Sequence, residues 1–441
     1  MSPSYRTIFF TSLIAITFFA VMGLGIASGW LMITLIAILV LFLLVGRHPL
    51  WLLMAIPLVI PLGKIASIPV GSQWMYDVTA TELAIIATAG VLILSILFYR
   101  TPTITSLPPL AYILLGLWLF EVVSLFWIHD IATYLIAVRV LLFHIAVFVL
   151  ATLIPRSEHD IWKALWALPA LLLLISAQLI WVLSTFGGFQ SQLLYGRNDV
   201  ATPVGALAFV LAIIVLLVPP TIVLRLRPIN PLIKIIIGCI LLLAAGAAFI
   251  GLGKAALLSL AIGFTYAIAR LQQWSTLWKT IIVACAAALL IWFIAPTAIE
   301  PLITRWQHVG SDASTSFRIE ELKTGWTQFV RHPFSGVGAG NLKYYYSRFL
   351  RGYQGESNNI VIQLSAESGI VGLLAFLLIV GSFIHMVRSP HLTPAMRVAF
   401  ESALLVAFVH GMVEATFIGL EYGVVFWYIA GLLAAATRVP K

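Results

Sequence analysis

The chain has little charge and almost no cysteine. Asp, Glu, Lys and Arg make up 9% of its 441 residues, whereas a soluble domain carries about 25%. Because 62% of the residues are hydrophobic, the chain would expose far too much apolar surface in water, which excludes an ordinary soluble domain. The two cysteines, Cys239 and Cys285, fall in apolar runs, so they indicate neither a disulfide framework nor a thiolate metal site.

The excess of basic residues does not indicate nucleic-acid binding. The formal net charge is +9, but the basic residues are spread over short connections rather than clustered. We therefore expect no nucleic-acid partner. The composition is typical of a polytopic, all-α membrane protein, since about 20 apolar residues suffice to span a bilayer.

Long apolar runs fill most of the chain and predict about 12–14 transmembrane helices. The first run is long for a signal peptide, so it is counted as a span. One long polar segment, 298–357, separates an N-terminal bundle of about eleven helices at 1–297 from C-terminal helices at 358–441. The candidate spans cover approximately residues 7–28, 30–46, 50–70, 78–99, 108–128, 131–154, 161–186, 201–224, 232–250, 254–271, 277–297, 359–387, 394–418 and 420–437.

The distribution of basic residues predicts the topology. Lys and Arg gather in alternate connections, and the short connections between them are nearly devoid of both. Since cytoplasmic loops are enriched in Lys and Arg, both termini are predicted to lie in the cytoplasm. The segment 298–357 is then extracytoplasmic.

Ionisable residues within the predicted spans gather in their outer halves. Each such charge costs about 2.5–3.5 kcal/mol at mid-span, so the asymmetry predicts a polar cavity that opens to the outside. A structural ion pair, such as one between Glu121 and Arg139, explains any single member equally well. The set comprises Lys64, Glu82, Glu121, Arg139, Arg197, Asp199, Lys254, Glu367, His410, Glu414 and Glu421.

Three cations are candidates to bind a diphosphate in this cavity. Arg197 and Lys254 follow glycine-containing turns, and Arg318 lies in the long polar segment. Glycine lets the backbone approach closely, a helix N-terminus offers free N–H groups to an anion, and a cation supplies the counter-charge. The predicted ligand is the head group of a polyprenyl-linked sugar; pairing of each cation with an acid is the alternative.

The polar segment contains a predicted amphipathic helix from about Ser316 to Val330. A glycine-rich turn follows it, and since no strand precedes this turn it does not predict a dinucleotide site. Trp326 and Tyr344 are candidates to stack on sugar rings, with Arg139 as a further acceptor contact, although aromatic residues are also enriched at membrane surfaces. The apolar positions of the helix are Ile319, Leu322, Trp326, Phe329 and Val330.

Two segments resemble the signature of the O-antigen ligase and polymerase superfamily. They are His332-Pro333-Phe334-Ser335-Gly336-Val337-Gly338 and, after Asn358-Asn359, the stretch Glu367-Ser368-Gly369-Ile370-Val371-Gly372. The resemblance covers about 296–376 and fits the predicted topology. It implies a glycosyltransferase that uses an undecaprenyl-diphosphate-linked donor on the outer face of the bacterial inner membrane. The acceptor is a glycan or a lipid A-core-like molecule, the configuration is inverted, and neither metal nor other cofactor is implied.

The chain departs from the family pattern at two positions. Asn358 stands where the resemblance implies a histidine that activates the acceptor hydroxyl, and Lys254 replaces an arginine, without its bidentate fork. Asparagine is not a base near neutral pH, so Glu356, His332 and Glu367 are candidates for that role. Without such a base, catalysis would rest on positioning and on stabilisation of the leaving group, with proton transfer to solvent, or the site would be altered or inactive. We favour a polymerase over a ligase because the ligase histidine is missing.

A transporter or flippase for lipid-linked oligosaccharide is the main competing function. Such proteins usually show inverted repeats and helices broken near the midplane, whereas the chain shows no internal repeat and its charges lie to one side. His410 and Glu414 have a spacing that permits a metal pair, but we find no third ligand and favour a structural hydrogen bond. A non-catalytic homologue is the third possibility.

Overall fold

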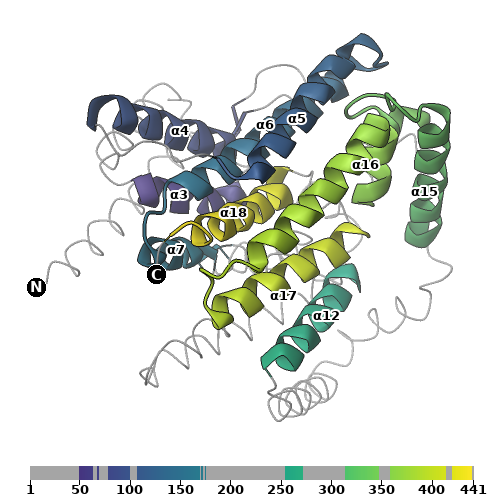
Figure 1. Cartoon of the computed structure of the whole chain (residues 1–441). Coiled ribbons are helices and arrows are strands. Elements are labelled where there is room, and N and C mark those ends of the chain that lie inside the picture. The colour runs from purple at the N-terminus through teal and green to yellow at the C-terminus, as the bar shows by residue number, and fades with distance from the viewer. Residues whose placement is uncertain are drawn as a thin grey trace, which may run out of the picture.

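The computed structural model describes residues 49–62, 67–68, 78–99, 107–168, 170–171, 174, 254–271, 313–346, 358–413 and 420–439 (Figure 1). This part of the chain is helical apart from two short strands, β1 (Ser67–Ile68) and β2 (Val78–Thr79), which pair antiparallel with Ser67 opposite Thr79. The helices are α3 (Pro49–Leu58), η1 (Ile60–Leu62), α4 (Ala80–Tyr99), α5 (Pro109–Val123), η3 (Ser124–Phe126), α6 (Ile131–Leu153), α7 (Glu158–Leu165), α12 (Lys254–Leu271), α15 (Ala313–Arg331), η4 (Leu342–Tyr345), α16 (Ile360–Val387), α17 (Pro394–Gly411) and α18 (Leu420–Ala436).

Local sequence signals set several helix starts. The Asp130 carboxylate accepts a hydrogen bond from Ala132 N at 2.9 Å and caps α6. Ser157 and Asp160 form a reciprocal capping box at the start of α7. Thr393 caps α17, and Pro394 occupies its first turn, where a missing N–H costs nothing.

Among the described residues, three helical stretches are long and apolar enough to cross a membrane: Pro109–Phe126, Ile131–Leu153 and Ile360–Val387. The predicted limits of the spans at 78–99, 131–154, 254–271, 359–387 and 420–437 agree with observed helices to within about two residues, as boundary fraying allows. The span at 394–418 is helical as far as Gly411. The total number of spans and their orientation remain predictions.

One predicted span differs from the structure. In the region 50–70 the helix α3 ends at Leu58, and β1 follows at Ser67, because Pro57 and Pro61 cannot continue a helical hydrogen-bond ladder. The span predicted at 161–186 begins with the end of α7, a turn follows at Trp166, and residues 167–168, 170–171 and 174 are again helical; its remainder lies outside the described residues. The spans predicted at 7–28, 30–46, 201–224, 232–250 and 277–297 lie outside the described residues.

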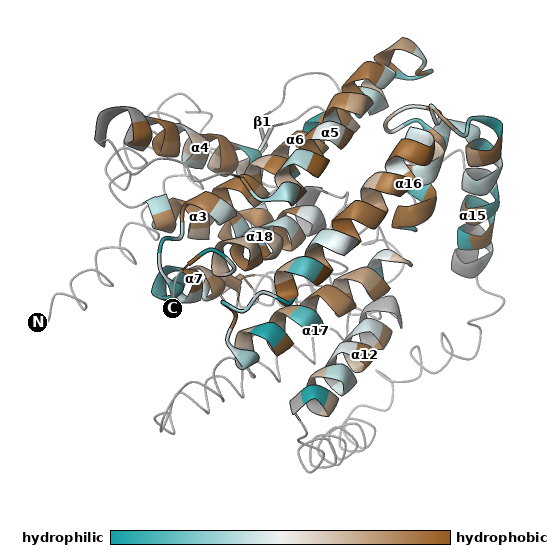
Figure 2. Cartoon of the chain, in the orientation of Figure 1, coloured by the Kyte–Doolittle hydropathy of each residue, from teal (hydrophilic) through white to brown (hydrophobic). Residues whose placement is uncertain are grey.

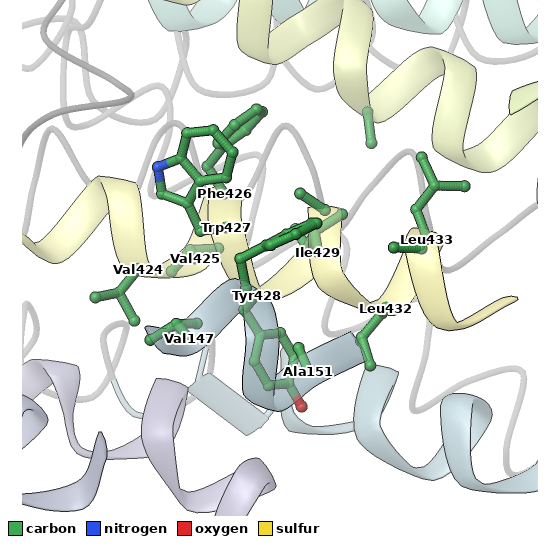
Figure 3. Close-up of a cluster of buried hydrophobic side chains, with 14 of the residues drawn as sticks. Val147, Ala151, Val424, Val425, Phe426, Trp427, Tyr428, Ile429, Leu432 and Leu433 are labelled. Carbon is green, nitrogen blue, oxygen red and sulfur yellow. The ribbon is translucent and has the colours of Figure 1, made fainter. Parts of the chain in front are cut away.

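Helix α18 forms the centre of the apolar core and packs along α6 (Figures 1 and 3). Its side chains from Val424 to Ala436 are buried on every face, as expected for a helix that is hydrophobic all round. A Cβ at Gly431 would stand within 2.6 Å of Ala151 Cβ, so this glycine allows the two helices to approach closely. The Tyr428 hydroxyl donates to the carbonyl of Ala164 at 2.9 Å, which satisfies its one buried polar atom and ties α18 to α7.

Candidate active site

The helix α16 is interrupted at Gly369, and the glycine-rich turn fills the interruption. Gly369 has φ 61° and ψ −145°, a positive-φ conformation that glycine adopts readily. The backbone N–H groups of Val337 and Gly338 donate to the carbonyls of Ala366 and Glu367, both at 2.9 Å, and Ile370 N donates to the Pro333 carbonyl at 2.7 Å. The two signature segments therefore interlock through their backbones.

This interlock explains the glycines of the turn. Gly336 has φ 64°, and a Cβ on it would collide with the backbone carbonyl of Glu367. The broken helix is a feature that transporters use to bind ions with freed carbonyls. Here the chain's own N–H groups occupy those carbonyls, so the break serves to hold the turn.

Asn341 joins the turn to the connection between α5 and α6. Its side chain is fully buried, and its Oδ1 accepts hydrogen bonds from the N–H groups of His129 at 3.0 Å and Asp130 at 2.8 Å. The amide donates to the Ala339 carbonyl at 2.8 Å, and Ala339 N donates to Ser124 Oγ at 3.1 Å. The turn is thus held on two sides, by α16 and by the α5–α6 connection.

The buried carboxylates beneath the turn have structural partners. Glu367 is buried and its Oε1 accepts from Leu342 N at 3.4 Å. Glu121 Oε1 accepts from the Ser368 hydroxyl at 3.3 Å. Arg139 forms a structural ion pair, the alternative considered above, but with Glu82 rather than with the example partner Glu121: Arg139 Nε lies 3.2 Å from Glu82 Oε1, which joins α6 to α4. Hydropathy places α4 in the chain but does not reveal which helix its glutamate faces.

Helix α15 exposes its apolar stripe, together with Lys323 and Thr327, and buries a face that carries Glu321. Trp326 and Val330 are 59% and 58% exposed, and Ile319 and Leu322 belong to the same exposed stripe. The opposite face packs on α16 and includes Glu321, which is 1% exposed, together with Gln328 and Gly325. Figure 2 shows the mixed hydropathy of this helix beside the largely apolar α16. A soluble helix would pack the other way round, so the buried polar face is a sign of function.

The buried face of α15 meets the start of α16 in a polar cluster. Glu321 Oε2 accepts a hydrogen bond from Asn358 Nδ2 at 2.7 Å, and the Tyr346 hydroxyl donates to Glu321 Oε1 at 3.4 Å. The guanidinium of Arg318, one turn earlier on α15, acts electrostatically on both Glu321 and His410. Burial raises the pKa of Glu321 above its usual range, and the hydrogen bonds and the Arg318 charge offset this only in part.

Three helix ends converge on this cluster. The Asn359 side chain accepts from Ile362 N at 3.0 Å, which caps α16, and donates to the Met412 carbonyl at 3.0 Å, at the end of α17. Helix α12 lies along α17 (Figure 1), and Arg270, near the end of α12, pairs with Glu401 in the first half of α17 at 3.4 Å. The two helices are therefore antiparallel, which places the start of α12 at the same end of the bundle as His410.

The structure thus brings some predicted site residues together and separates others. Asn358 and Arg318 lie in the cluster, and Lys254 begins α12 at the same end of the bundle. His332 is exposed beyond the end of α15, about 16 Å along the helix from Glu321. Glu367 lies about two turns along α16 from its start, beneath the glycine turn. Arg197, Glu356 and Glu414 lie outside the described residues.

The aromatic candidates lie on exposed surfaces. Tyr344 stacks on His129 with ring centroids 5.3 Å apart and an interplanar angle of 16°, and it is 62% exposed. Tyr345 meets the same imidazole edge-on at 5.6 Å. Trp326 stands on the outer stripe of α15, against Phe329. Among the described residues, no three His, Cys, Asp or Glu side chains lie close enough to hold a metal ion.

Residues 239–377 match the family model described as O-antigen ligase. This part of the chain is similar to the O-antigen ligase family. The match confirms the resemblance to the O-antigen ligase and polymerase superfamily, whose members are glycosyltransferase-like membrane enzymes that act on lipid-linked glycans. A comparison with curated proteins gave no match.

The matched segment contains most of the polar cluster. Arg318, Glu321, Tyr346 and Asn358 lie within residues 239–377, whereas His410 comes from α17 beyond it. Sequence reasoning did not select Glu321 as a site residue. The available signal was a carboxylate three residues after Arg318 on the polar face of an amphipathic helix, a pattern that is equally typical of a solvent-exposed ion pair.

Proposed function

We propose that the protein is a membrane glycosyltransferase that takes a glycan from an undecaprenyl-diphosphate-linked donor on the outer face of the bacterial inner membrane. Both termini are then cytoplasmic, and residues 298–357 form an extracytoplasmic loop domain. The observation that carries the proposal is the Arg318–Glu321–Asn358 cluster, in which Glu321 is buried, within a segment that matches the O-antigen ligase family. We favour polymerisation of the glycan over its ligation to a lipid A-core-like acceptor.

The cations at this end of the bundle suit the diphosphate of the donor. Arg318 is only partly buried, and we assign its guanidinium to the diphosphate of the donor. The N-terminus of α12 begins at Lys254 and offers free backbone N–H groups to an anion. We assign Arg197 to the same role. Positive charge at this position stabilises the diphosphate as it leaves, which lowers the barrier to transfer.

The outer stripe of α15 suits a lipid-linked substrate. Ile319, Leu322, Trp326 and Val330 form an exposed apolar face on an otherwise polar segment, and large exposed apolar patches mark interaction sites or membrane contacts. This apolar surface lies on the side of α15 opposite Glu321. It suits contact with the polyprenyl chain or with the bilayer around it.

In the proposed reaction the acceptor hydroxyl attacks the anomeric carbon on the face opposite the departing diphosphate, which inverts the configuration. Asn358 orients the acceptor hydroxyl, and Tyr344 on His129 provides a stacking surface for a sugar ring. Glu367 holds the glycine turn in place and is not assigned to the reacting atoms. No step requires a metal ion.

Substitution of Arg318 tests the diphosphate assignment. We expect Arg318→Ala to lower kcat/KM for the lipid-linked donor by about 10–100-fold, since a hydrogen bond to a charged group contributes about 1.5–3 kcal/mol, and Arg318→Lys to retain part of it. The assay is transfer from extracted lipid-linked glycan in membrane vesicles. Arg331→Ala, which removes an exposed cation from the same helix, is the matched control. Equal rates for wild type and Arg318→Ala would contradict the assignment.

A further inference from the structure

The polar cluster contains one carboxylate, that of Glu321, to which the proposed mechanism assigns no role. Glu321 is 1% exposed, and an ionisable group is rarely buried to that extent without a purpose, because desolvation is costly. Its partners come from three places along the chain: Arg318 on its own helix, Tyr346 after η4, and Asn358 before α16. The chain therefore builds a specific setting for this one side chain.

The reaction needs a proton acceptor at this place. A sugar hydroxyl is a weak nucleophile until its proton is removed, and a positioned base contributes about 10²–10⁴-fold. Asn358 has no basic atom at neutral pH. Among the described residues, Glu321 is the one carboxylate that accepts a hydrogen bond from Asn358. A carboxylate oxygen has two lone pairs, so Oε2 can bind the Asn358 amide and a hydroxyl held beside that amide.

We propose that Glu321 is the catalytic base that takes the proton of the acceptor hydroxyl. This inference rests on the proposed function. As the O–H bond breaks, the hydroxyl oxygen forms a bond to the anomeric carbon, and the bond from that carbon to the diphosphate oxygen breaks with its electron pair. The proton passes to a Glu321 oxygen and then to water. The products are the extended acceptor, polyprenyl diphosphate and one released proton.

The surroundings of Glu321 tune it for this role. Burial raises the pKa of its carboxyl, while the hydrogen bonds from Asn358 and Tyr346 and the charge of Arg318 lower it. The net pKa lies above the ordinary value of about 4.3 for a glutamate, which makes the ionised form a stronger base. The charge of Arg318 also acts on His410 of α17. The base acts only when ionised, so the rate falls as the pH drops through this raised pKa.

The geometry also explains how the site works without a histidine. In a triad, an acid orients an imidazole that takes the proton. Here the Glu321 carboxylate contacts the Asn358 amide. Because the amide cannot take a proton, the carboxylate takes it directly. Asn358 then holds the hydroxyl against Glu321 instead of activating it.

The test measures transfer from lipid-linked glycan, extracted from a strain that lacks the gene, in vesicles that contain the full-length protein. We expect Glu321→Gln, which keeps the volume and an acceptor for Asn358, to lower kcat by about 10²–10⁴-fold with the donor KM unchanged. Its residual rate loses the acidic limb of the pH profile. Glu320→Gln, one residue away on the helix, is the matched control and keeps both rate and profile.

A second variant separates a missing base from a damaged site. Adding Asn358→His to Glu321→Gln supplies an imidazole at the same place, and we expect it to restore part of the rate with an acidic limb near the histidine pKa of about 6.5. If Glu321→Gln does not insert into the membrane, Glu321→Asp decides, because a shortened base lowers kcat at an unchanged donor KM.

Several results would overturn the inference. One is a Glu321→Gln or Glu321→Asp protein with wild-type kcat and pH profile. Another is a loss of activity that appears in the donor KM and that Asn358→His does not restore. If wild-type protein itself transfers nothing from the lipid-linked donor, the proposed function fails. If wild type and Glu321→Gln transfer equally, only the assignment of the base fails.

Discussion

Tyr344 illustrates how a single exposed ring is prepared for binding. It lies flat on His129 at 5.3 Å, and the backbone on both sides of this contact is fixed by Asn341, which accepts from His129 N and directly precedes η4. An aromatic ring that is 62% exposed yet held by its neighbour offers a flat apolar face at little entropic cost. Such a face is suited to a sugar ring.

Removing this ring tests its role at the residue scale. We expect Tyr344→Ala to raise the KM for a glycan substrate by about 2–10-fold, because an aromatic stacking contact contributes about 0.5–1.5 kcal/mol. Thermal stability of the detergent-solubilised protein stays close to wild type, since the ring is exposed. Tyr344→Phe keeps the ring and serves as control. A KM unaffected by the loss of the ring would count against the stacking platform.

At the scale of elements, the packing of α15 on α16 determines the site. Glu321 and Gly325 are one turn apart on the buried face of α15, and they meet Asn358 and Ile362 at the start of α16. Because Gly325 has no side chain, α15 approaches closely enough for the 2.7 Å hydrogen bond between Glu321 and Asn358 to form. The glycine turn then fixes the far end of α15 against the break in α16.

Adding one methyl group at Gly325 tests this packing. A Cβ there would collide with Ile362 Cγ2. This methyl group cannot move away freely, because the β-branched isoleucine side chain has a restricted χ1 in a helix. We expect Gly325→Ala to cost about 1–3 kcal/mol of stability and to lower activity by moving Glu321 off Asn358. Gly381→Ala, in the same α16, is the control because nothing lies within 4 Å of its added Cβ. Adding Ile362→Ala relieves the clash and restores part of the activity; failure to do so would contradict the explanation.

At the scale of the whole molecule, sequence patterns predicted helix positions well and helix partners poorly. The limits of α12 and α16 follow from hydropathy because long apolar runs allow few other boundaries. The inward face of α15 could not be predicted, since its apolar stripe is the usual sign of a buried face. Glu121 was considered as a possible ion-pair partner of Arg139, and the structure pairs Arg139 with Glu82. Pairing depends on helix rotation and tilt, which no single segment encodes.

The sequence likewise predicted only some of the residues of the candidate site. Asn358 was found through the family signature, which is carried by local sequence, and Arg318 was found as a cation in the polar segment. Glu321 was missed because its partners lie 25 and 37 residues away along the chain, and only the folded structure shows that they surround it. The glycines of the signature were expected to form a turn, and the structure shows that this turn joins a broken helix.

Glycan length in a strain that lacks this gene, measured on the lipid-linked and surface fractions and compared with wild type, decides whether the protein polymerises lipid-linked glycan. A polymerase with Glu321 as its base predicts single repeat units on the polyprenyl carrier and no polymer, restored by the wild-type gene and not by Glu321→Gln. Long polymer stranded on the carrier would keep the transfer of lipid-linked glycan but make the enzyme a ligase. An unchanged glycan profile would contradict both functions.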